Sequence, residues 1–456
     1  MSTTDPPPPW RRALVIGLGR SGLAAVQLLR AMGVDVRGYD ARPQVPGLPD
    51  ELLVDLGSPA PPATAYDGID LLVLSPGVPP QAIVAQAQRL APKAAIHGEM
   101  GLALSLVGTR QAWPRVPTVL ITGTNGKSTV TALTGALLEA AGHQPFIGGN
   151  LGIPLCERLH ETLVGSTAWC DALVLECSSY QLETLPRVPT DVAMLINLSP
   201  DHLDRYDSLE HYARTKARVF TGLGEPDLAL LDADDPWTER LAPANGHVRR
   251  VGDHQVAYLR GDGDDEALVV GDRVIARAAL PLAGRHNARN ALFALLAAQH
   301  LGVSEADCRQ GLSAFEGLPH RMVLVRQLAG VAYYNDSKAT NVASAIAGLS
   351  GLDRPFVLIA GGLSKGDDLG PLRQVLAQRG RGLIAVGSSA EQFAAMAAGV
   401  VPVDRAEGMH EAVTRARAMA ADGEAVVLAP ACASFDQYRS YAQRGEAFIA
   451  AVQRLH

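Results

Sequence analysis

Short apolar runs alternate with helix-like segments along most of this chain. The runs at residues 13–16, 71–74, 119–121 and 172–175 consist entirely of Val, Ile, Leu and Ala. Such unbroken runs are typical of strands that are buried on both faces of a parallel sheet. Segments with helical periodicity, such as residues 129–141, follow several of these runs. The pattern therefore predicts an α/β protein built on parallel sheets.

The chain is too long for one ordinary hydrophobic core, since it has 456 residues. Its runs group into three predicted domains, at residues 1–115, 116–318 and 319–456. Within the last domain, strands are predicted at residues 356–360, 383–386 and 425–429. The first ten residues include four consecutive prolines and no apolar stretch, which predicts a disordered leader rather than a secretory signal.

A glycine loop at residues 122–128, with the sequence TGTNGKS, lies between an apolar run and a helical segment. In that setting, backbone N–H groups and a helix N-terminus can cradle phosphates. Lys127 can reach the β and γ oxygens, and Ser128 can ligate Mg²⁺. Ile121 stands where the usual phosphate loop has its first glycine. The context predicts a nucleotide site.

A second glycine loop, G-x-G-x-x-G at residues 17–22, also follows a strand and precedes a helix. Asp40 ends the next predicted strand, where an acid can accept a hydrogen bond from a ribose. This fingerprint is typical of NAD-linked oxidoreductases. A dehydrogenase does not need a second phosphate loop, however, and a further glycine turn lies at residues 75–77. NAD, another nucleotide diphosphate and a purely structural turn all remain open from the pattern alone.

Three features after the first phosphate loop can support catalysis. Glu176 follows a strand directly, at the end that faces the ligand crevice in open α/β sheets, where it can hold Mg²⁺ or cap the strand. His202 lies in an Asp/His cluster after the predicted strand at residues 192–196, which can bind metal or form an ordinary loop. Lys216 lies on an amphipathic segment at residues 209–220, and the pattern favours a solvated lysine.

The composition narrows the class of protein. The net charge of −7 argues against a protein that coats nucleic acid. No apolar run approaches the ~18 residues of a membrane span. The five cysteines form no CxxC pair, which predicts reduced, buried thiols in a cytoplasmic protein.

Six strings resemble, in the same order, the motifs of the Mur ligases of peptidoglycan synthesis. They are TGTNGKST at 122–129, LECSSYQLE at 175–183, DHLDRY at 201–206, GRHNARNALFA at 284–294, HR at 320–321 and NDSKATN at 335–341. The strings at 336–341 and 430–438 (PACASFDQY) resemble the branch of this family that adds D-glutamate. Pattern and resemblance together predict a Rossmann-like N-terminal domain, a central P-loop ATPase-type domain and a Rossmann-like C-terminal domain.

The resemblance implies ATP-dependent amide formation on UDP-N-acetylmuramoyl-L-alanine. ATP phosphorylates the substrate carboxylate, the amine of D-glutamate attacks the acyl phosphate, and phosphate leaves. Cations must neutralise the phosphates during these steps. Two Mg²⁺ ions are implied, and CO₂ is needed to carbamylate a lysine. The implied protein is a monomeric enzyme of cell wall biogenesis, with consequences for cell shape and division.

The resemblance also assigns residues to the reacting end of the site. The implied catalytic residues are Lys127, Glu176, His202, Lys216 and Lys338. The implied metal ligands are Ser128, Glu176, His202 and Lys216, the last as a carbamate. Such a carbamate requires the amine to lose its proton, against an ordinary pKa of about 10.4. The implied ATP-binding residues are Gly123, Thr124, Asn125, Gly126, Lys127, Ser128, Thr129, Asn287, Asn290, Arg321 and Asp336.

The two remaining substrates are assigned in the same way. The implied UDP-sugar residues are Gly17, Leu18, Gly19, Ser21, Asp40, Arg42, Ser75, Pro76, Gly77 and Asn150. The implied amino-acid residues are Thr340, Lys365, Ser434 and Tyr441. Under this resemblance, the first glycine loop holds a nucleotide sugar and not NAD. Two positions depart from the family: Ser364 stands in place of an acid before Lys365, and Cys177 replaces an aliphatic residue.

Three rivals remain from the sequence. A folylpolyglutamate synthase shares the phosphate loop and the lysine but does not need the loop at residues 17–22. An NAD oxidoreductase uses that loop alone. A protein that binds nucleotides without chemistry has no reason to retain Lys127, Glu176, His202 and Lys216 together.

Overall fold

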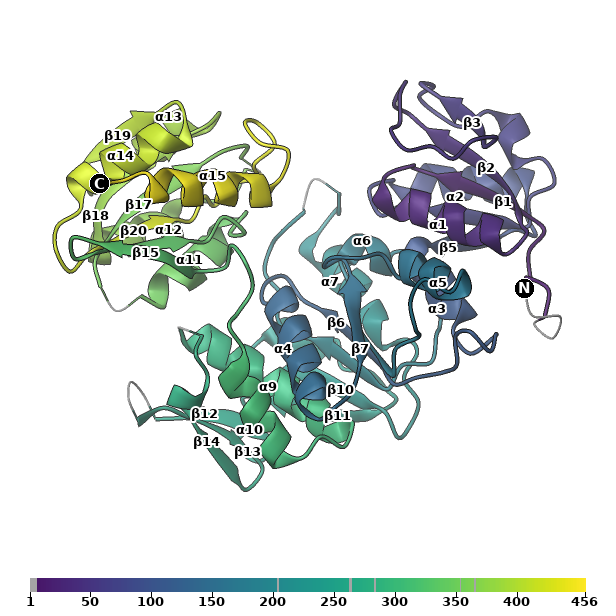
Figure 1. Ribbon diagram of the computed structural model, residues 1–456, viewed down its shortest axis with the longest axis horizontal. Helices are drawn as coiled ribbons and strands as arrows, with labels where there is room; N and C mark the ends of the chain where they lie inside the picture. The colour runs from purple at the N-terminus through teal and green to yellow at the C-terminus, as the bar shows by residue number, and fades with distance from the viewer. Residues whose placement is uncertain (1–5, 203–204, 262–264, 283, 353, 365) are drawn as a thin grey trace. The chain divides into compact units, whose positions relative to one another are not determined.

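The computed structural model describes residues 6–202, 205–261, 265–282, 284–352, 354–364 and 366–456. The chain divides into two compact units. The first comprises Met1–Arg260, Leu268–Ile275 and Leu292–Leu312, and the second comprises Gly261–Ala267, Ala276–Ala291 and Ser313–His456. Three sheets are formed, which the ribbon in Figure 1 shows in chain order from purple to yellow.

The first sheet has five parallel strands in the order β3-β2-β1-β4-β5. Its strands are β1 (Arg12–Ile16), β2 (Asp35–Asp40), β3 (Leu53–Leu56), β4 (Leu71–Leu74) and β5 (Ala95–Gly98). Its helices are α1 (Arg20–Ala31), η1 (Ala63–Tyr66), α2 (Pro80–Leu90) and α3 (Glu99–Leu106). The order reverses beside β1, so the crevice at the carboxyl ends of β1 and β4 is a topological switch point, where such sheets bind ligands.

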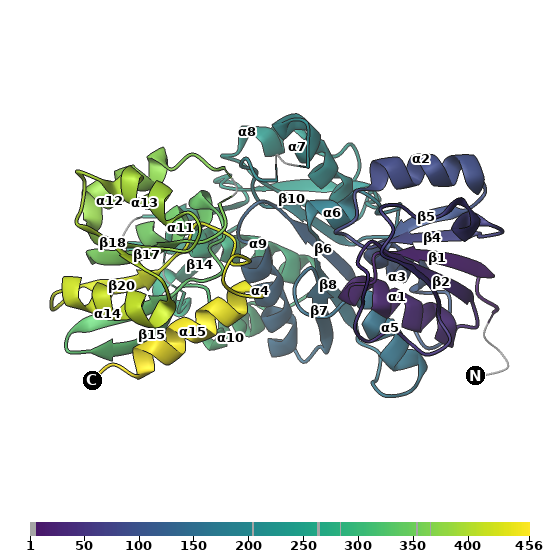
Figure 2. The ribbon, with the colours of Figure 1, turned by 90° about the horizontal axis from the view of Figure 1, so that it is seen from above.

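Alternate residues of β1 pack on opposite faces of this sheet. Ala13 and Val15 belong to the core that includes α1 and α3, whereas Leu14 and Ile16 belong to the core that includes α2. Figure 2 shows α2 on one side of the sheet and α1 with α3 on the other. This two-sided burial explains the unbroken apolar run in the sequence.

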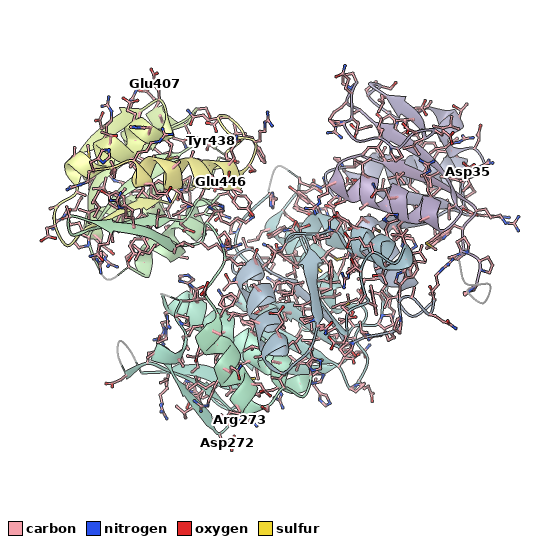
Figure 3. The ribbon with its side chains drawn as sticks, viewed as in Figure 1. Asp35, Asp272, Arg273, Glu407, Tyr438 and Glu446 are labelled. Atoms are coloured by element: carbon pink, nitrogen blue, oxygen red, sulfur yellow. The ribbon has the colours of Figure 1, made fainter. Side chains whose placement is uncertain are left out.

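Polar contacts fix the amino ends of the same strands. Asp35, labelled in Figure 3, accepts a hydrogen bond of 2.9 Å from Arg12 Nε, and these two residues begin β2 and β1. Trp10 was included in the predicted leader but is buried, with its ring against His97 at 5.7 Å between centroids.

The central sheet has nine strands in the order β14-β13-β12-β11-β10-β9-β6-β8-β7. They are β6 (Thr118–Thr122), β7 (Pro145–Gly149), β8 (Ala172–Glu176), β9 (Val192–Leu195), β10 (Leu228–Asp232), β11 (His247–Val251), β12 (Ala257–Arg260), β13 (Ala267–Val270) and β14 (Arg273–Ala276). Its helices are α4 (Lys127–Ala140), α5 (Leu155–Leu163), α6 (Ser179–Leu182), α7 (Leu209–Ala217), η2 (Arg218–Phe220), α8 (Pro236–Arg240), η4 (Arg277–Ala279), α9 (Arg285–His300) and α10 (Glu305–Ala314). Strands β6 to β10 run parallel to one another. The carboxyl ends of β6, β8 and β9 therefore lie along one edge of the sheet.

The third sheet lies in the second unit and has the order β15-β16-β20-β17-β18-β19. Its strands are β15 (Val323–Leu328), β16 (Val331–Asn335), β17 (Phe356–Gly361), β18 (Gly380–Val386), β19 (Val403–Ala406) and β20 (Ala425–Leu428). Its helices are α11 (Val342–Ser350), α12 (Gly370–Arg379), α13 (Ala390–Ala397), α14 (Met409–Met419) and α15 (Tyr441–Gln453). Among the described strands of this sheet, only β15 and β16 pair in the antiparallel direction. Alternate residues of β17 again pack into two cores, one with α11 to α13 and one with α14 and α15.

The predicted α/β class with parallel sheets is confirmed. The strands named from the sequence begin and end within about two residues of their predictions, except that β18 begins three residues before the predicted start at residue 383. All five cysteines are buried and free, as predicted. Among the helices that the structure describes, none is long and apolar enough to cross a membrane.

Candidate active site

The phosphate loop lies between β6 and α4 in a conformation that only glycine adopts easily. Gly126 is the N-cap of α4 with φ 82°, and Gly123 has φ 155°. A Cβ atom on Gly123 would lie 2.4 Å from Ile196 Cγ1, so no larger residue fits there. Lys127 Nζ donates to the carbonyl oxygens of Gly123 (2.9 Å) and Thr124 (2.8 Å). The loop therefore presents backbone N–H groups, a helix N-terminus and a lysine within a few ångströms of one another.

Asn197, two residues after the end of β9, holds this loop from the neighbouring strand. Its Oδ1 accepts from the backbone N–H groups of Thr124 (3.1 Å) and Asn125 (2.9 Å), and its Nδ2 donates to Asn125 O (2.9 Å). Thr124 Oγ1 also donates to Ser199 O at 3.1 Å. The sequence interpretation assigned no role to Asn197. Its position, two residues beyond a buried strand that neighbours β6, is the signal that could have identified it.

Lys216 is buried beside the phosphate loop and is not the solvated helix lysine that the pattern favoured. It is 2% exposed, and its Nζ donates to Gly123 O (2.8 Å) and Thr122 Oγ1 (3.3 Å). Burial lowers the pKa of Lys216 well below its ordinary value, and the Lys127 cation lowers it further. The carboxylates of Asp201 and Glu176 raise the pKa of Lys216 in opposition, so both lie close enough to act on its charge.

Glu176 ends β8 and is 2% exposed. Its Oε1 accepts from Asn150 Nδ2 at 2.5 Å, and its backbone oxygen accepts from the N–H of Asn150 at 2.9 Å. The structure thus brings together Glu176 and the residue expected to hold the muramoyl-alanine arm. Cys177, the departure from the family, packs its buried sulfur 3.5 Å from Met100 Sδ. The Cys177 side chain therefore fills a buried position next to Met100, as an aliphatic side chain would.

His202 adopts a left-handed backbone conformation with φ 54° after β9. Its Nδ1 lies 2.9 Å from the hydroxyl oxygen of Tyr180, and its backbone N–H donates to Asp201 Oδ1 at 2.9 Å. Because Tyr180 contacts one ring nitrogen, the orientation of the imidazole is restrained, and the other nitrogen, Nε2, lies 3.7 Å from Asp201 Oδ2.

The first glycine loop shows the close packing that its fingerprint predicts. A Cβ on Gly22 would lie 1.9 Å from Gly17 O, whereas a Cβ on Gly19 would meet nothing within 4 Å. Ser75 Oγ donates to Gly17 O at 2.5 Å and joins this loop to the turn at residues 75–77. Backbone is thus accessible at Gly19, where a diphosphate can approach it.

Asp40 was expected to accept from a ribose, but its oxygens are already used. Its Oδ2 accepts from Leu18 N–H (2.7 Å) and from Arg42 Nη2 (2.7 Å), and its Oδ1 accepts from Arg42 Nε (2.8 Å). These contacts with Arg42 hold the pKa of Asp40 well below its ordinary range. In this structure Asp40 organises the loop and Arg42, which weakens the NAD interpretation that depended on it.

The second unit brings together several other predicted residues. Lys338 Nζ lies 3.9 Å from the centre of the Tyr441 ring, and Ser434 is buried. Asp336 is also buried, and burial raises its pKa to about 8. Thr340 N–H donates to Lys338 O at 2.8 Å, so these two residues occupy one turn.

The remaining predicted residues lie on α9, beside Asp336 or outside the described residues. Asn287 and Asn290 lie on α9, with Asn290 Nδ2 3.4 Å from Asn287 Oδ1. Arg321 lies just before β15, close enough to Asp336 to lower the pKa of that carboxyl against the effect of burial. Lys365 lies outside the described residues.

Arg444 joins the two loops of the second unit and had no signal in the sequence. It is 2% exposed, and burial lowers its pKa to about 10. Its guanidinium donates to Ser337 Oγ (3.0 Å) and Ser337 O (2.9 Å) on one loop, and to Cys432 O (3.1 Å) on the other. These loops carry the predicted residues Lys338 and Ser434, so Arg444 fixes one relative to the other.

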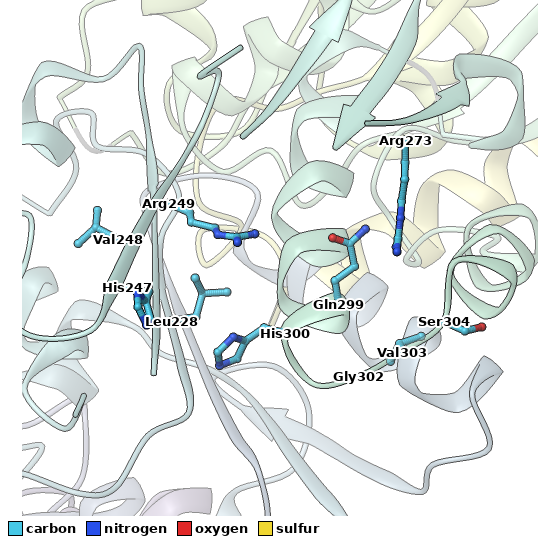
Figure 4. A pocket seen from close by; sticks show the side chains of 10 residues that line it. All are labelled: Leu228, His247, Val248, Arg249, Arg273, Gln299, His300, Gly302, Val303 and Ser304. Atoms are coloured by element: carbon cyan, nitrogen blue, oxygen red, sulfur yellow. The ribbon is translucent and has the colours of Figure 1, made fainter. Parts of the chain in front are cut away.

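A separate cavity of about 690 Å³ lies in the first unit, lined by His247, Arg249, Arg273 and His300 among others (Figure 4). Its residues Leu228 and His247 begin β10 and β11. The cavity therefore lies at the amino ends of these strands, whereas the phosphate loop lies at the carboxyl ends of the sheet. It is not part of the candidate site.

A phosphate loop on a parallel sheet, with a carboxylate and a buried lysine beside it, defines a nucleotide-binding enzyme of the P-loop class. Three family models match the chain: a Mur ligase MurD-like, N-terminal domain at residues 11–95, a Mur ligase middle domain at 121–298, and a Mur ligase, glutamate ligase domain at 320–432. The chain belongs to the Mur ligase family.

Curated relatives match it over nearly the full length of both chains. The UDP-N-acetylmuramoylalanine–D-glutamate ligase of Aromatoleum aromaticum is 41% identical, over 98% of this chain and 97% of the relative. The enzyme of the same name from Nitrosospira multiformis is 40% identical, over 98% and 96%.

Solved structures share the fold at lower identity. The UDP-N-acetylmuramate-alanine ligase of Thermotoga maritima aligns with a TM-score of 0.61 and 16% identity, over 97% of this chain and 99% of the other. The folylpolyglutamate synthase of Mycobacterium tuberculosis aligns with a TM-score of 0.60 and 17% identity, over 81% and 98%. At these identities the likeness shows the fold alone.

Proposed function

We propose that this chain is an ATP-dependent ligase that joins D-glutamate to UDP-N-acetylmuramoyl-L-alanine through an acyl phosphate. The observation that carries the proposal is the gathering of Lys127, Glu176 and the buried Lys216 around the phosphate loop. Full-length relatives at 37–41% identity that bear this ligase name support the same activity. A carboxylate is a poor electrophile, and phosphorylation by ATP makes it reactive.

The residues of the first unit have the chemistry for the phosphorylation step. The backbone N–H groups of the phosphate loop and Lys127 would hold the β and γ phosphates and offset the charge that develops during transfer. Asn197 keeps the loop in one conformation, so little reorganisation is required when the nucleotide binds. Asn150, which donates to Glu176, would place the muramoyl-alanine arm beside these groups.

Magnesium fits this site on one condition. Among the described residues, no three His, Cys, Asp or Glu side chains gather as a metal site. Ser128, Glu176 and His202 supply the oxygen and imidazole ligands, but Lys216 as an ammonium would add a cation beside Lys127 and repel a dication. With Lys216 as a carbamate, the donor set gains an anion in place of that cation. When bound, Mg²⁺ supplies neutralisation of phosphate charge.

The amino-acid end of the reaction is proposed for the second unit. Lys338, Thr340 and Ser434 would contact D-glutamate, with Tyr441 beside Lys338 and Arg444 behind both loops. A nucleotide-linked substrate and ATP are both cytoplasmic metabolites, so we place the reaction in the cytoplasm. We also propose that the enzyme acts as a monomer.

Phosphate release with ATP, Mg²⁺ and UDP-N-acetylmuramoyl-L-alanine tests the proposal. Release is expected with D-glutamate and not with L-glutamate or without an amino acid. Turnover with folate and glutamate in place of the nucleotide sugar would instead support a folylpolyglutamate synthase. Quenching of NADH fluorescence on mixing would support an oxidoreductase.

A further inference from the structure

A short segment after α6, residues 183–186, packs directly against the first domain. A Cβ on Gly98 would lie 2.4 Å from Thr184 Oγ1, and a Cβ on Gly101 would lie 2.5 Å from Pro186 Cδ. Both contacts are too close for any residue but glycine. At Gly98 and Gly101, the first domain therefore packs against this segment of the central domain with no room for a side chain.

Arg205 reaches across this contact through the Nε and Nη2 atoms of its guanidinium. Its Nε and Nη2 donate to the two carboxylate oxygens of Glu183 at 3.0 and 2.5 Å. Both side chains are about nine-tenths buried, at 10% and 8% exposed. The guanidinium also lies 4.4 Å from the centre of the Tyr180 ring. A bidentate, buried and stacked arginine is held in one geometry, which a lysine cannot reproduce.

The same guanidinium donates a hydrogen bond to the first domain. Arg205 Nη2 lies 3.1 Å from Val78 O, and Val78 N–H donates to Ser75 O at 3.0 Å. A Cβ on Gly17 would lie 2.8 Å from Val78 Cγ2, so Val78 packs on the first glycine loop. Arg205 is thus one residue away from both loops that are proposed to bind the UDP moiety.

On its other side, Arg205 contacts the ring that orients His202. Tyr180 lies beneath the guanidinium, and its hydroxyl contacts His202 Nδ1 at 2.9 Å. One buried side chain therefore touches a residue at the UDP end and a residue at the reacting end. Fixing these two ends relative to each other is a positional task, because the nucleotide sugar must place its carboxylate at the γ-phosphate while its uridine is held far away.

We infer that Arg205, oriented by Glu183, is a positioning residue that fixes the loop at residues 75–78 on the central domain and thereby sets the affinity for the nucleotide-sugar substrate. Arg205 contacts no reacting atom. The inference rests on the proposed function, because it takes the loops at residues 17–22 and 75–77 as the UDP site.

The test uses the full-length variant Arg205→Lys, which keeps the charge and loses the two-pronged contact. UDP is the binding probe, measured by calorimetry without turnover. The Kd of UDP and the KM of the nucleotide sugar are expected to rise about ten-fold or more, while the KM of ATP changes by less than about two-fold. Arg250→Lys is the matched control: Arg250 pairs with Glu239 through two contacts, at 2.6 and 3.0 Å, within the central domain. The Arg250→Lys variant should leave the Kd of UDP, the KM of the nucleotide sugar and the KM of ATP unchanged.

The possible outcomes separate the inference from the proposed function. Wild-type protein that does not bind UDP overturns the assignment of the UDP site, and the inference falls with it. Wild-type binding that Arg205→Lys leaves unchanged overturns the inference alone. If Arg205→Lys also weakens ATP binding or lowers the Tm beyond the control, Glu183→Gln decides, since it keeps Arg205 and removes one charged acceptor. An equal loss of UDP and ATP affinity in that variant would show a merely structural role.

Discussion

Glu99 provides a direct test of how the first unit is packed. It begins α3, is 1% exposed, and its Oε1 accepts a hydrogen bond of 2.6 Å from the backbone N–H of Cys156 in the first turn of α5. Its Oε2 is buried and makes no hydrogen bond within the described part of the chain. Burial raises the pKa of Glu99 to about 7. The perturbation is Glu99→Gln, which keeps the shape and the acceptor oxygen but cannot ionise.

The magnitude follows from linkage between ionisation and folding. The pKa rises from 4.5 in the unfolded chain to about 7 in the folded protein. Each pH unit is worth 1.36 kcal/mol, so ionising Glu99 in the folded state costs about 3 kcal/mol. Below pH 4.5 both states are protonated and the cost is absent. Between pH 4.5 and 7 only the unfolded state releases its proton, so wild-type stability falls as the pH rises, and above pH 7 the loss is complete.

The free energy of unfolding of Glu99→Gln, relative to wild type, should therefore increase by about 3 kcal/mol between pH 4.5 and pH 7.5. Guanidinium unfolding followed by tryptophan fluorescence suits the measurement, because all four tryptophans (Trp10, Trp113, Trp169 and Trp237) lie in the first unit. Because the free energies of unfolding of the two proteins are compared as a function of pH, any pH-independent cost of burying the amide cancels.

Glu161→Gln is the control for the loss of one negative charge. Glu161 lies on the same helix, α5, but is partly exposed. Its difference from wild type should be nearly constant over the same pH range. If Glu99→Gln gives the same flat difference, the Glu99 carboxylate is not buried at the start of α5 as the structure has it, and the reasoning fails.

The remaining predictions concern the proposed activity. Lys127→Ala should reduce acyl-phosphate formation by ~10³-fold or more, measured as phosphate release, because phosphoryl transfer depends on such charges; a mild effect would place the nucleotide elsewhere. Lys216→Ala should lose activity and regain part of it with a short-chain carboxylate supplied in solution, and full activity without bicarbonate would exclude the carbamate. Arg444→Lys should raise the KM for glutamate about ten-fold with little change in the KM for ATP, because a lysine cannot contact both loops at once; an unchanged KM for glutamate would refute the role given to Arg444.

The strands and the phosphate loop could be predicted because their signals are local. Residues 71–74 are apolar throughout, and the structure buries all four on both faces of the first sheet. In the loop at residues 122–128, Gly123 and Gly126 have positive φ angles of 155° and 82°, which is a requirement of the local backbone. In such cases the residues that decide the structure are the ones that a short window contains.

Asp40 shows where local reasoning stops. Its position at the end of a strand predicted an acid that accepts from a ribose, and in the structure Asp40 accepts from Leu18 N–H and from Arg42. The partner that occupies it, Arg42, is only two residues away, but its direction depends on the turn that follows β2. The motif thus predicted that an acid ends β2, but it did not predict that Arg42 would be its hydrogen-bond donor.

The burial of Lys216 and of Arg444 could not be predicted from the sequence pattern, and the two side chains differ in how readily they lose a proton. Lys216 and Arg444 both lie on amphipathic helices, where a solvated side chain is the ordinary expectation, and both are 2% exposed because distant segments cover them. Arg444 spreads its donors over several carbonyl and hydroxyl oxygens, and its pKa of about 10 leaves it charged at neutral pH. Lys216 has two oxygen acceptors and the Lys127 cation nearby, so its amine loses its proton far more readily. Only an uncharged amine can react with CO₂, so the position proposed to become an anionic metal ligand requires lysine, whereas the position that joins two loops requires the permanent fork of arginine.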